Sequence, residues 1–316
     1  MKKIFMLSLL PILLAGCNKG GTTPSSNDEY KKLKFVTPTG APAIAMSAFC
    51  DLEGFETNND PSNIVPMMAK GQVDVAVLPT NIGVNAIKKQ NVGFKLLCTI
   101  TYGNFYIAAT GNDDDAVMDA DDYIVSFQQN AVPDKVFHYI YGDTYDSALH
   151  YVGSNALAAK CLATGKNASD DNKDVDYVLI AEPALTTVLS KNPARSLYKS
   201  LTEEYKAKSD GLLLAQASVF VKSSLDQEKI INPLFSALNE SVNQMINSPE
   251  KVESNMNKID NPAVIFGVDP AVAKAVTENG NRMGLGCKAA STIKNDINEF
   301  LGIFGVSEIT DENIAK

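Results

Sequence analysis

The sequence predicts an α/β fold of two similar lobes, each a mainly parallel sheet flanked by helices. The same local plan of strand, polar loop and helix occurs at residues 33–51, 71–89, 123–141 and 173–191. The strand of each unit is a continuous apolar run, which is typical of a parallel sheet with both faces covered by helices. The chain is long enough to bury the cores of two such lobes.

Two units begin the expected first lobe. Residues 33–42 (LKFVTPTGAP) lead into a helix at 43–51, and residues 71–81 (GQVDVAVLPTN) lead into a helix at 82–89. Between them, an Asp-Pro pair and a later Gly are typical of a helix start and a helix end, which predicts a helix over 61–70. A strand, a helix and a second strand in this order form a right-handed parallel crossover.

The other two units form the expected second lobe. Residues 123–133 (YIVSFQQNAVP) lead into a helix at 134–141, and residues 173–183 (KDVDYVLIAEP) lead into a helix at 184–191. A Pro stands near the start of each helix, which is a position that Pro favours. Because the arrangement repeats, we expect two lobes.

Two β-prone stretches, residues 102–110 and 212–222, bracket the second lobe and are expected to carry the chain between the lobes. Three later segments, 230–246, 269–279 and 289–304, have the spacing of amphipathic helices that return to the first lobe. The expected limits are therefore residues 31–103 with 216–316 for the first lobe and 104–215 for the second.

The chain begins with a leader that is typical of an exported protein. Two lysines precede an apolar stretch, residues 4–14, that is too short to remain as a membrane-spanning helix. It ends in Leu-Ala-Gly-Cys17, which resembles the lipobox of bacterial lipoproteins, in which the Cys becomes the first mature residue and carries diacylglycerol. We expect residues 1–17 to be a lipoprotein signal peptide with its lipobox and residues 18–30 to be a flexible tether. The alternative is an ordinary secretory leader with an incidental Cys.

This leader predicts the location of the protein. Several acyl chains on Cys17 would hold a folded domain at the membrane without a spanning helix. We therefore expect a lipid-anchored, extracytoplasmic protein of a bacterial cell envelope, facing either the outside or the periplasm.

The formal charge is acidic, −9 for the whole chain, and it becomes −11 once Lys2 and Lys3 leave with the leader. Lys and Arg do not cluster along the sequence. This charge disfavours nucleic acid and anionic lipid as partners.

Cysteine and histidine usage gives no sign of a metal site or a cofactor. No CxxC pattern occurs, and the two histidines, His138 and His150, stand alone. Apart from Cys17, an even number of cysteines allows three complete disulfide pairings in an exported protein. We expect buried free thiols rather than bridges, since Cys98 lies in an apolar run where a buried thiol is commoner. The four are Cys50, Cys98, Cys161 and Cys287.

The order and spacing of these segments resemble those of solute-binding lipoproteins of ABC importers, and most closely the nitrate, sulfonate and thiamine-precursor branch. The resemblance rests on the lipobox, residues 37–42 (TPTGAP), 71–81, 175–183 and a closing helix within 287–304. It implies the periplasmic-binding-protein type II fold, a two-lobed clamp with its ligand in the cleft between the lobes. It also implies a monomer without catalytic activity that delivers a small-molecule solute to an ABC permease.

The expected site follows from the strand ends, because ligands of open α/β sheets bind at the carboxyl ends of the strands. Four such ends are identifiable, at residues 37–42, 78–81, 128–131 and 181–183. They supply neutral hydrogen-bonding groups, a glycine that allows close backbone approach, and one carboxylate. We expect the ligand-binding residues to be Thr39, Gly40, Ala41, Thr80, Asn81, Asn104, Phe105, Tyr106, Gln128, Gln129, Asn130 and Glu182.

The residue types at these strand ends constrain the ligand. They contain no Arg or Lys, which disfavours a multiply charged phosphate. Glu182 is their only charge and can accept hydrogen bonds from an amine or an amidine-like nitrogen. Tyr102, Phe105, Tyr106 and Phe127 are placed to form an aromatic wall. We expect a small neutral or cationic organic solute with an aromatic or heterocyclic ring.

Two other function classes stay open at this point. Enzymes of the menaquinone pathway and hydroxymethylbilane synthase resemble the same clamp but normally lack an export leader. The chain has no GxSxG motif, and neither histidine has a recognisable nucleophile partner. Residues 284–289 (GLGCKA) fit GxGxxA, but without a preceding βαβ unit we interpret them as a turn before the last helix. The third class is a surface adhesin or antigen without a small ligand.

Overall fold

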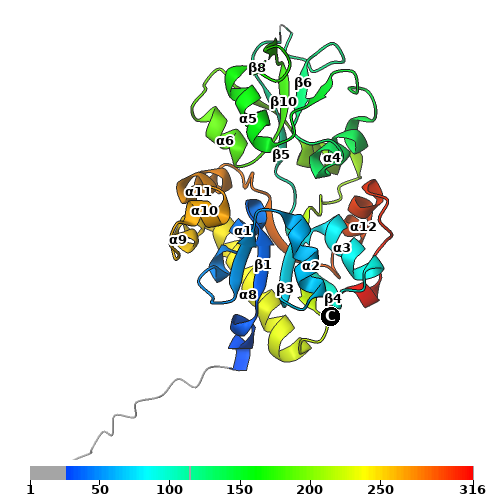
Figure 1. Ribbon diagram of the computed structural model, residues 1–316, viewed down its shortest axis with the longest axis vertical. Coiled ribbons are helices and arrows are strands. Elements are labelled where there is room, and N and C mark those ends of the chain that lie inside the picture. Colours follow the sequence, from blue (N-terminus) through cyan, green and yellow to red (C-terminus); the bar gives the residue numbers. More distant parts are fainter. Residues whose placement is uncertain (1–25, 114, 316) are drawn as a thin grey trace, which may run out of the picture.

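The computed structural model describes residues 26–113 and 115–315. These residues form two lobes, one above the other in Figure 1. The expected signal peptide, the lipobox with Cys17 and the first part of the expected tether lie outside the described residues. The last part of that tether, residues 26–30, is helical instead and belongs to the 3-10 helix η1 (Ser26–Lys32).

Lobe 1, the lower lobe in Figure 1, is built on a six-stranded sheet in the order β13-β4-β12-β3-β1-β2. Its strands are β1 (Phe35–Pro38), β2 (Phe55–Asn58), β3 (Val75–Pro79), β4 (Phe94–Thr101), β12 (Ala217–Lys222) and β13 (Leu285–Ala289). Its α-helices are α1 (Ala41–Ala45), α2 (Ile64–Ala69), α3 (Thr80–Lys89), α8 (Asn232–Asn247), α9 (Glu250–Met256), α10 (Pro262–Phe266), α11 (Pro270–Glu278) and α12 (Lys294–Ile303). Its shorter helical turns are η2 (Ser47–Phe49), η3 (Pro61–Asn63), η4 (Gln227–Ile231) and η5 (Asp311–Asn313).

Lobe 2 is built on a five-stranded sheet in the order β11-β5-β10-β6-β7. Its strands are β5 (Phe105–Ala109), β6 (Ile124–Ser126), β7 (Leu149–Tyr151), β10 (Tyr177–Ala181) and β11 (Ser196–Ser200), with a small separate hairpin of β8 (Lys166–Asn167) and β9 (Lys173–Asp174). Its helices are α4 (Val132–Tyr141), α5 (Asn155–Thr164), α6 (Ala184–Leu189) and α7 (Leu201–Lys208).

The two-lobed α/β fold is as expected, but each sheet is mixed rather than mainly parallel. In lobe 1, β1 pairs in parallel with β2 and β3, and in lobe 2, β6 pairs in parallel with β7 and β10. By contrast, β12 is antiparallel to β3 and β4, and β5 is antiparallel to β10 and β11. The reason is that β5 and β12 bring the chain in from the other lobe, so they run away from the edge at which the parallel strands end.

The local signals at the helix between β1 and β3 act as expected. Asp60 is the N-cap residue, and its carboxylate accepts a hydrogen bond from the Ser62 N–H at 2.9 Å. The chain then passes from η3 into α2, and Gly71 follows with a φ of +66°, a conformation that glycine adopts without steric cost. The helix expected over 61–70 is therefore present as η3 followed by α2.

The interpretation of residues 284–289 as a turn before the last helix is wrong. Residues Leu285–Ala289 form β13, an edge strand antiparallel to β4, and α12 begins only at Lys294. A glycine within the strand and an irregular register make β13 unlike the continuous apolar runs of the other strands. Only the glycine at 284, with a φ of +67°, turns the chain into it.

The register shows which way the strand ends point. Pro79, the last residue of β3, pairs with Ala217, the first residue of β12, where the chain has just entered lobe 1. Ala181, the last residue of β10, pairs with Phe105, the first residue of β5, where the chain has just entered lobe 2. Because β1 is parallel to β3, and β6 to β10, all four strands end at the edge of their sheet that faces the other lobe.

Buried apolar side chains connect the lobes. Among the described residues, one core cluster lies within lobe 1 and another within lobe 2. A further cluster contains residues of both lobes, including Leu78 and Phe300 from lobe 1 and Ile107 and Leu179 from lobe 2. The lobes therefore share apolar packing and are not independent bodies joined only by a linker.

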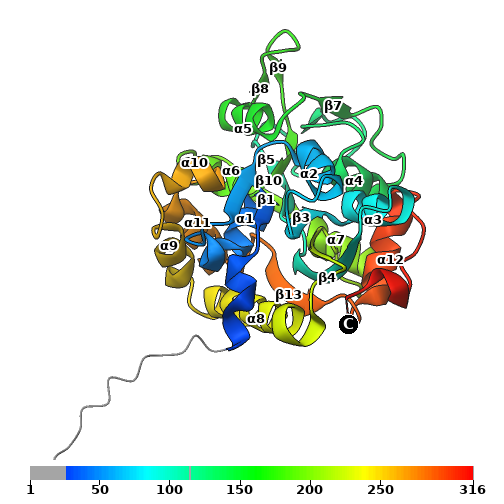
Figure 2. The same ribbon diagram turned by 60° about the horizontal axis from the view of Figure 1, so that its bottom comes forward.

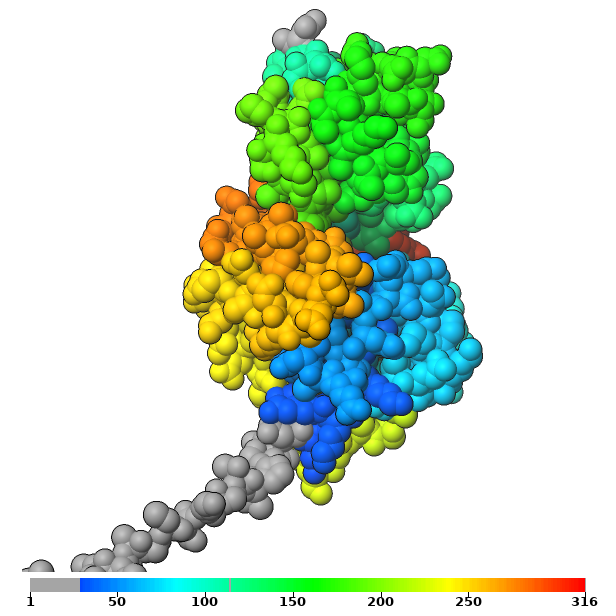
Figure 3. Space-filling model, turned by 60° about the vertical axis from the view of Figure 1, so that its left-hand side comes forward, coloured from blue at the N-terminus to red at the C-terminus, as the bar shows by residue number. Residues whose placement is uncertain are grey.

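The surface between the lobes is hollowed on one side. Figure 3 shows a recess between lobe 2, in green, and the blue part of lobe 1, beside the place where the orange helices of lobe 1 approach lobe 2.

Within residues 26–113 and 115–315, none of the helices combines the length and the apolar character needed to span a membrane.

Candidate functional site

The candidate site lies where the strand ends of both lobes meet the two chain crossings. The first crossing, residues 102–104, joins β4 to β5, and the second crossing, residues 209–216, joins α7 to β12. The register places the ends of β1, β3, β6 and β10 at the sheet edges that face this region.

At the end of β1, the loop is shaped by a glycine. Gly40 has a φ of +86°, and its N–H donates to the carbonyl oxygen of Phe266 at 2.9 Å. Thr39 is half-buried beside Gly267, where an added Cβ would lie 3.4 Å from the Cβ of Thr39. Ala41 begins α1 and is buried. The backbone of this loop is therefore held against α10, and Thr39 is its accessible polar side chain.

At the end of β3, Thr80 turns inward. Its hydroxyl is fully buried, 2.7 Å from the Ser218 hydroxyl, which in turn lies 2.9 Å from the Thr99 hydroxyl. Asn81 is half-buried, and its Oδ1 atom is buried without a hydrogen-bond partner among the described residues. Of this pair, only Asn81 keeps a side-chain oxygen without a hydrogen-bond partner among the described residues.

The loop after β6 is exposed, and a buried carboxylate holds it. Gln128, Gln129 and Asn130 are all exposed, and Asn130 has a φ of +62°. The Asn130 N–H donates to Oδ2 of Asp134 at 2.7 Å, and the Tyr151 hydroxyl donates to Oδ1 of Asp134 at 2.6 Å. The three side chains at this strand end are therefore presented to solvent on a fixed backbone.

Asn104 and Gln216 tie the two crossings together. The Asn104 side chain donates to the carbonyl oxygen of Glu182 at 2.9 Å and accepts from the Gln216 amide at 3.1 Å. The backbone carbonyl oxygen of Gln216 accepts a hydrogen bond from the Thr80 N–H at 3.0 Å. The structure thus joins Thr80, Asn104 and Glu182, three of the expected site residues, through Gln216, which sequence reasoning did not select.

The aromatic residues at the start of β5 are mostly buried. Phe105 and Tyr106 are 5% and 6% exposed, so neither ring offers a free face. The Phe105 ring lies 6.5 Å, between centroids, from that of Phe127, which is only half-buried. Phe127 is therefore the more accessible of these rings. The Tyr106 hydroxyl donates to the carbonyl oxygen of Arg282 at 3.1 Å.

Glu182 is already bound within the protein. Its carboxylate accepts from the Thr186 N–H at 2.9 Å and the Thr186 hydroxyl at 2.8 Å, and Oε1 lies 3.1 Å from Nε of Arg282. Burial raises the pKa of Glu182, while the Thr186 hydrogen bonds and Arg282 act in the opposite direction. The carboxylate expected to receive a cationic ligand therefore has partners on both oxygens.

Sequence reasoning also missed Arg282. This residue lies in the loop between α11 and β13 of lobe 1, outside the four strand ends, and no local pattern points from there to lobe 2. The available signal was a single basic residue in a loop rich in Gly and Asn, residues 279–286. The four strand ends contain no Arg or Lys, as their sequence shows, but the fold brings Arg282 beside Glu182.

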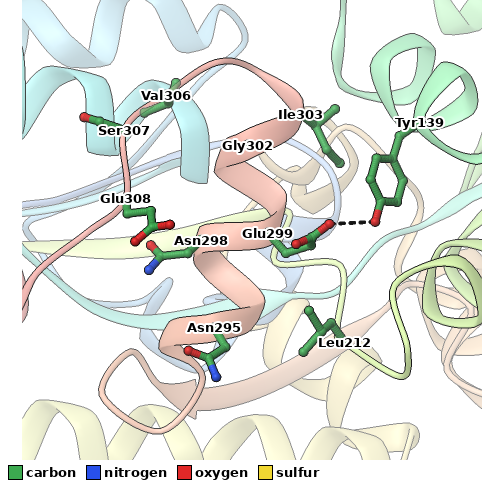
Figure 4. A pocket seen from close by; sticks show the side chains of 10 residues that line it. All are labelled: Tyr139, Leu212, Asn295, Asn298, Glu299, Gly302, Ile303, Val306, Ser307 and Glu308. Atoms are coloured by element: carbon green, nitrogen blue, oxygen red, sulfur yellow. Dashed lines mark hydrogen bonds between the residues drawn. The ribbon is translucent and has the colours of Figure 1, made fainter.

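A groove of about 680 Å³ lies at the seam of the lobes on the α12 side (Figure 4). Helix α12 forms its floor, with Leu212 of the second crossing and Tyr139 of lobe 2 at one end. The Tyr139 hydroxyl donates to Oε1 of Glu299 at 2.6 Å, and burial together with Glu299 raises the pKa of Tyr139 to about 12. This bond joins α4 of lobe 2 to α12 of lobe 1.

No group of three or more His, Cys, Asp and Glu side chains is placed to hold a metal ion within the described part of the chain. The cysteines at 50, 98, 161 and 287 are buried free thiols, as expected. Burial raises the pKa of the Cys50 thiol to about 11.

Several solved structures share this architecture, and they include proteins described as an ABC transporter, a sulphonate binding protein and a ligand-binding component of an import system. One described as an ABC transporter from Parabacteroides distasonis aligns with a TM-score of 0.68 at 17% identity, covering 86% of this chain and 91% of that one. The periplasmic aliphatic sulphonate binding protein SsuA from Escherichia coli aligns with a TM-score of 0.63 at 10% identity, covering 90% and 92%. The zinc-bound ligand-binding component of an ABC-type import system from Staphylococcus aureus aligns with a TM-score of 0.59 at 9% identity, covering 90% and 96%.

These likenesses establish the fold. The chain has the two-lobed periplasmic-binding-protein architecture that its sequence predicts. No protein-family model matches the chain, and no curated protein matches it.

Proposed function

We propose that this protein is a lipid-anchored, extracytoplasmic receptor that binds a small organic solute between its lobes and delivers it to an ABC importer. It acts as a monomer and catalyses no reaction. The solute bridges the lobes and shifts their equilibrium toward a closed form that the permease recognises.

The observation that supports this proposal most is the convergence of four parallel-strand ends, two from each lobe, on the edge between the lobes. In open α/β sheets this edge is where ligands bind. Architectural likeness to binding components of import systems supports the same role.

For the solute, we propose an uncharged organic molecule with an aromatic or heterocyclic ring. The accessible polar groups at the strand ends are neutral, at Thr39, Asn81 and residues 128–130. The half-buried ring of Phe127 offers a stacking surface. Because the Glu182 carboxylate is already paired with Arg282, it provides little support for the cationic alternative.

The direct test is to identify the cargo. Full-length protein purified without denaturation is extracted, and the released small molecules are identified by mass spectrometry. Each candidate is then added back and the melting temperature is measured, since a ligand that binds only the folded state raises it with concentration. We expect one compound to stabilise the protein, with a 1:1 stoichiometry by calorimetry.

A matched pair of variants locates the site. Gln128→Ala removes an exposed amide at the carboxyl end of β6. Gln72→Ala removes an exposed amide near the amino end of β3, which is the end that points away from lobe 2. We expect Gln128→Ala to weaken binding and Gln72→Ala to leave it unchanged. Equal affinities for the two variants would argue against the proposed strand-end site.

Lipid anchoring needs its own test. Cells grown with an alkyne-labelled fatty acid should incorporate the label into the wild-type protein and not into Cys17→Ser. If the wild-type protein is instead found in the growth medium without the fatty-acid label, an ordinary secretory leader is supported.

Two outcomes would favour the other function classes. Chemical conversion of the retained molecule by the purified protein would support an enzyme of the same fold. Full stability without any stabilising metabolite, together with binding to a host surface, would support an adhesin or antigen.

A further inference from the structure

We propose that Arg282 is a positioning residue that latches lobe 2 onto lobe 1 through Glu182 without any solute. The inference concerns the lobe movement on which the proposed receptor function depends. It makes the lobe contact a property of the chain itself, which a solute strengthens rather than creates.

Three polar contacts of Arg282 reach from lobe 1 to lobe 2. Its Nε lies 3.1 Å from Oε1 of Glu182, and its Nη2 donates to the Thr186 hydroxyl at 2.7 Å. Its backbone oxygen accepts from the Tyr106 hydroxyl at 3.1 Å. Arg282 belongs to lobe 1, whereas Glu182, Thr186 and Tyr106 all belong to lobe 2. One residue therefore carries three polar contacts between the lobes.

Burial makes these contacts depend on lobe position. The Glu182 side chain is 0% exposed and that of Arg282 is 19% exposed. A buried carboxylate that loses its charged partner is destabilised, so Arg282 stabilises Glu182 in this place together with the two hydrogen bonds from Thr186. When the lobes separate, water can reach both groups and replace the pair. Because desolvation offsets much of the attraction, the latch can hold the lobes and still release them.

A second bridge lies on the opposite side of the crossings. Helices α6 and α11, which flank the Arg282 latch, are on one side of the molecule, and α4 and α12 are on the other in both Figures 1 and 2. There the Tyr139 hydroxyl donates to Glu299. With a bridge on each side, a sideways rocking of lobe 2 in either direction must break one of them.

Glu182 is unsuitable as the test position because it also binds the N–H of Thr186 in α6, so its replacement would disturb lobe 2. Arg282→Met removes the guanidinium from a loop and keeps an unbranched side chain. Tyr106→Phe removes one hydroxyl and keeps the ring. Lys222→Met is the matched control, because Lys222 pairs with Asp74 at 3.6 Å within lobe 1.

The measurement is the distance between nitroxide labels on Lys70→Cys of lobe 1 and Asp143→Cys of lobe 2, taken by pulsed electron resonance without any solute. Both positions are exposed, whereas the cysteines at 50, 98, 161 and 287 are buried and should stay unlabelled in the folded protein. We expect a longer or broader distance distribution for Arg282→Met, a smaller change for Tyr106→Phe, and the wild-type distribution for Lys222→Met.

Wild-type distributions for both Arg282→Met and Tyr106→Phe would overturn the latch. An equal change in Lys222→Met would overturn it too, since the effect would then follow any lost ion pair. If Arg282→Met fails to fold, Arg282→Lys takes its place, because it keeps a positive charge but loses the guanidinium that reaches both Glu182 and Thr186. Because no solute is used, failure of the proposed receptor function would show in the cargo and melting experiments and not here.

Discussion

Gly284 packs against Gly103 so closely that a Cβ atom on Gly284 would lie 2.1 Å from the Gly103 carbonyl oxygen. Gly103 is in the first crossing, and Gly284 precedes β13, so this contact fixes the edge of lobe 1 to the chain as it leaves for lobe 2. The Tyr102 N–H donates to the Gly284 carbonyl oxygen at 2.8 Å, so a hydrogen bond joins the two backbones where they approach.

Gly284→Ala should therefore be strongly destabilising. It combines a left-handed φ of +67° with a clash against backbone, which cannot rotate away as a side chain can. Gly280→Ala is the control, with a φ of +70° and no atom within 4 Å of the added Cβ. We expect urea denaturation to show a loss of about 1–2 kcal/mol for Gly280→Ala and a clearly larger loss for Gly284→Ala. Similar losses would mean that the contact is not tight.

Thr80→Val tests the buried hydroxyl chain at the end of β3. The change leaves the Ser218 hydroxyl with one partner fewer in a fully buried position. We expect a loss of about 1–3 kcal/mol in the free energy of unfolding. The exposed Thr144, whose hydroxyl donates to the Tyr141 carbonyl oxygen, provides the control variant Thr144→Val. An unchanged stability for Thr80→Val would contradict the assignment of this hydroxyl to the core.

Acid stability should depend on Asp122. Burial raises its pKa to about 6, and Asp113, Asp119 and Asp176 add to the rise against the lowering effect of the Asp119 N–H. A carboxyl group that holds its proton more tightly when folded stabilises the fold at low pH, and this stabilisation is lost as the pH rises through about 6.

We therefore expect Asp122→Asn to melt higher than the wild type at pH 7 and to lose the decrease between about pH 4 and 6. Melting temperatures across this range measure the effect. Asp121→Asn, at the exposed neighbouring position, is the control and should keep the wild-type profile. A wild-type profile for Asp122→Asn would show that the raised pKa does not contribute.

The buried thiols should be unreactive in the folded protein. A chain of residues 26–316 prepared without reductant should show almost no reaction with a thiol reagent when native, because all of its cysteines are buried. After unfolding, Cys50, Cys98, Cys161 and Cys287 should all react. A smaller number of reacting thiols after unfolding would reveal a disulfide and contradict the structure.

The strand-loop-helix units were predictable because their signals are local. The Asp60 cap, the Gly71 stop and the apolar run at 75–78 each specify structure within a few residues. The strand β13 was not, because its glycine and irregular register carry no periodic pattern and its place depends on β4. The candidate strand ends were located correctly at the gap edge, since parallel strands must end together.

The state of individual side chains could not be read from the sequence. Thr80 looks like any polar residue at a strand end, and only its packing against β12 turns the hydroxyl inward toward Ser218. Glu182 looks like a free charge until the lobes bring Arg282 beside it. Such contacts join residues far apart in the chain, and they follow from how the lobes pack rather than from any local pattern.

The order of strands also sets the order in which the molecule can be completed. Strand β12 lies between β3 and β4 in the lobe 1 sheet, yet the whole of lobe 2 precedes it in the chain. During synthesis or export from the amino end, lobe 2 can complete its sheet while lobe 1 still lacks the strand between β3 and β4. The first lobe to begin is the last to finish, and a protein truncated before residue 217 would leave β4 without either of its neighbours, β12 and β13, and would leave one edge of β3 unpaired.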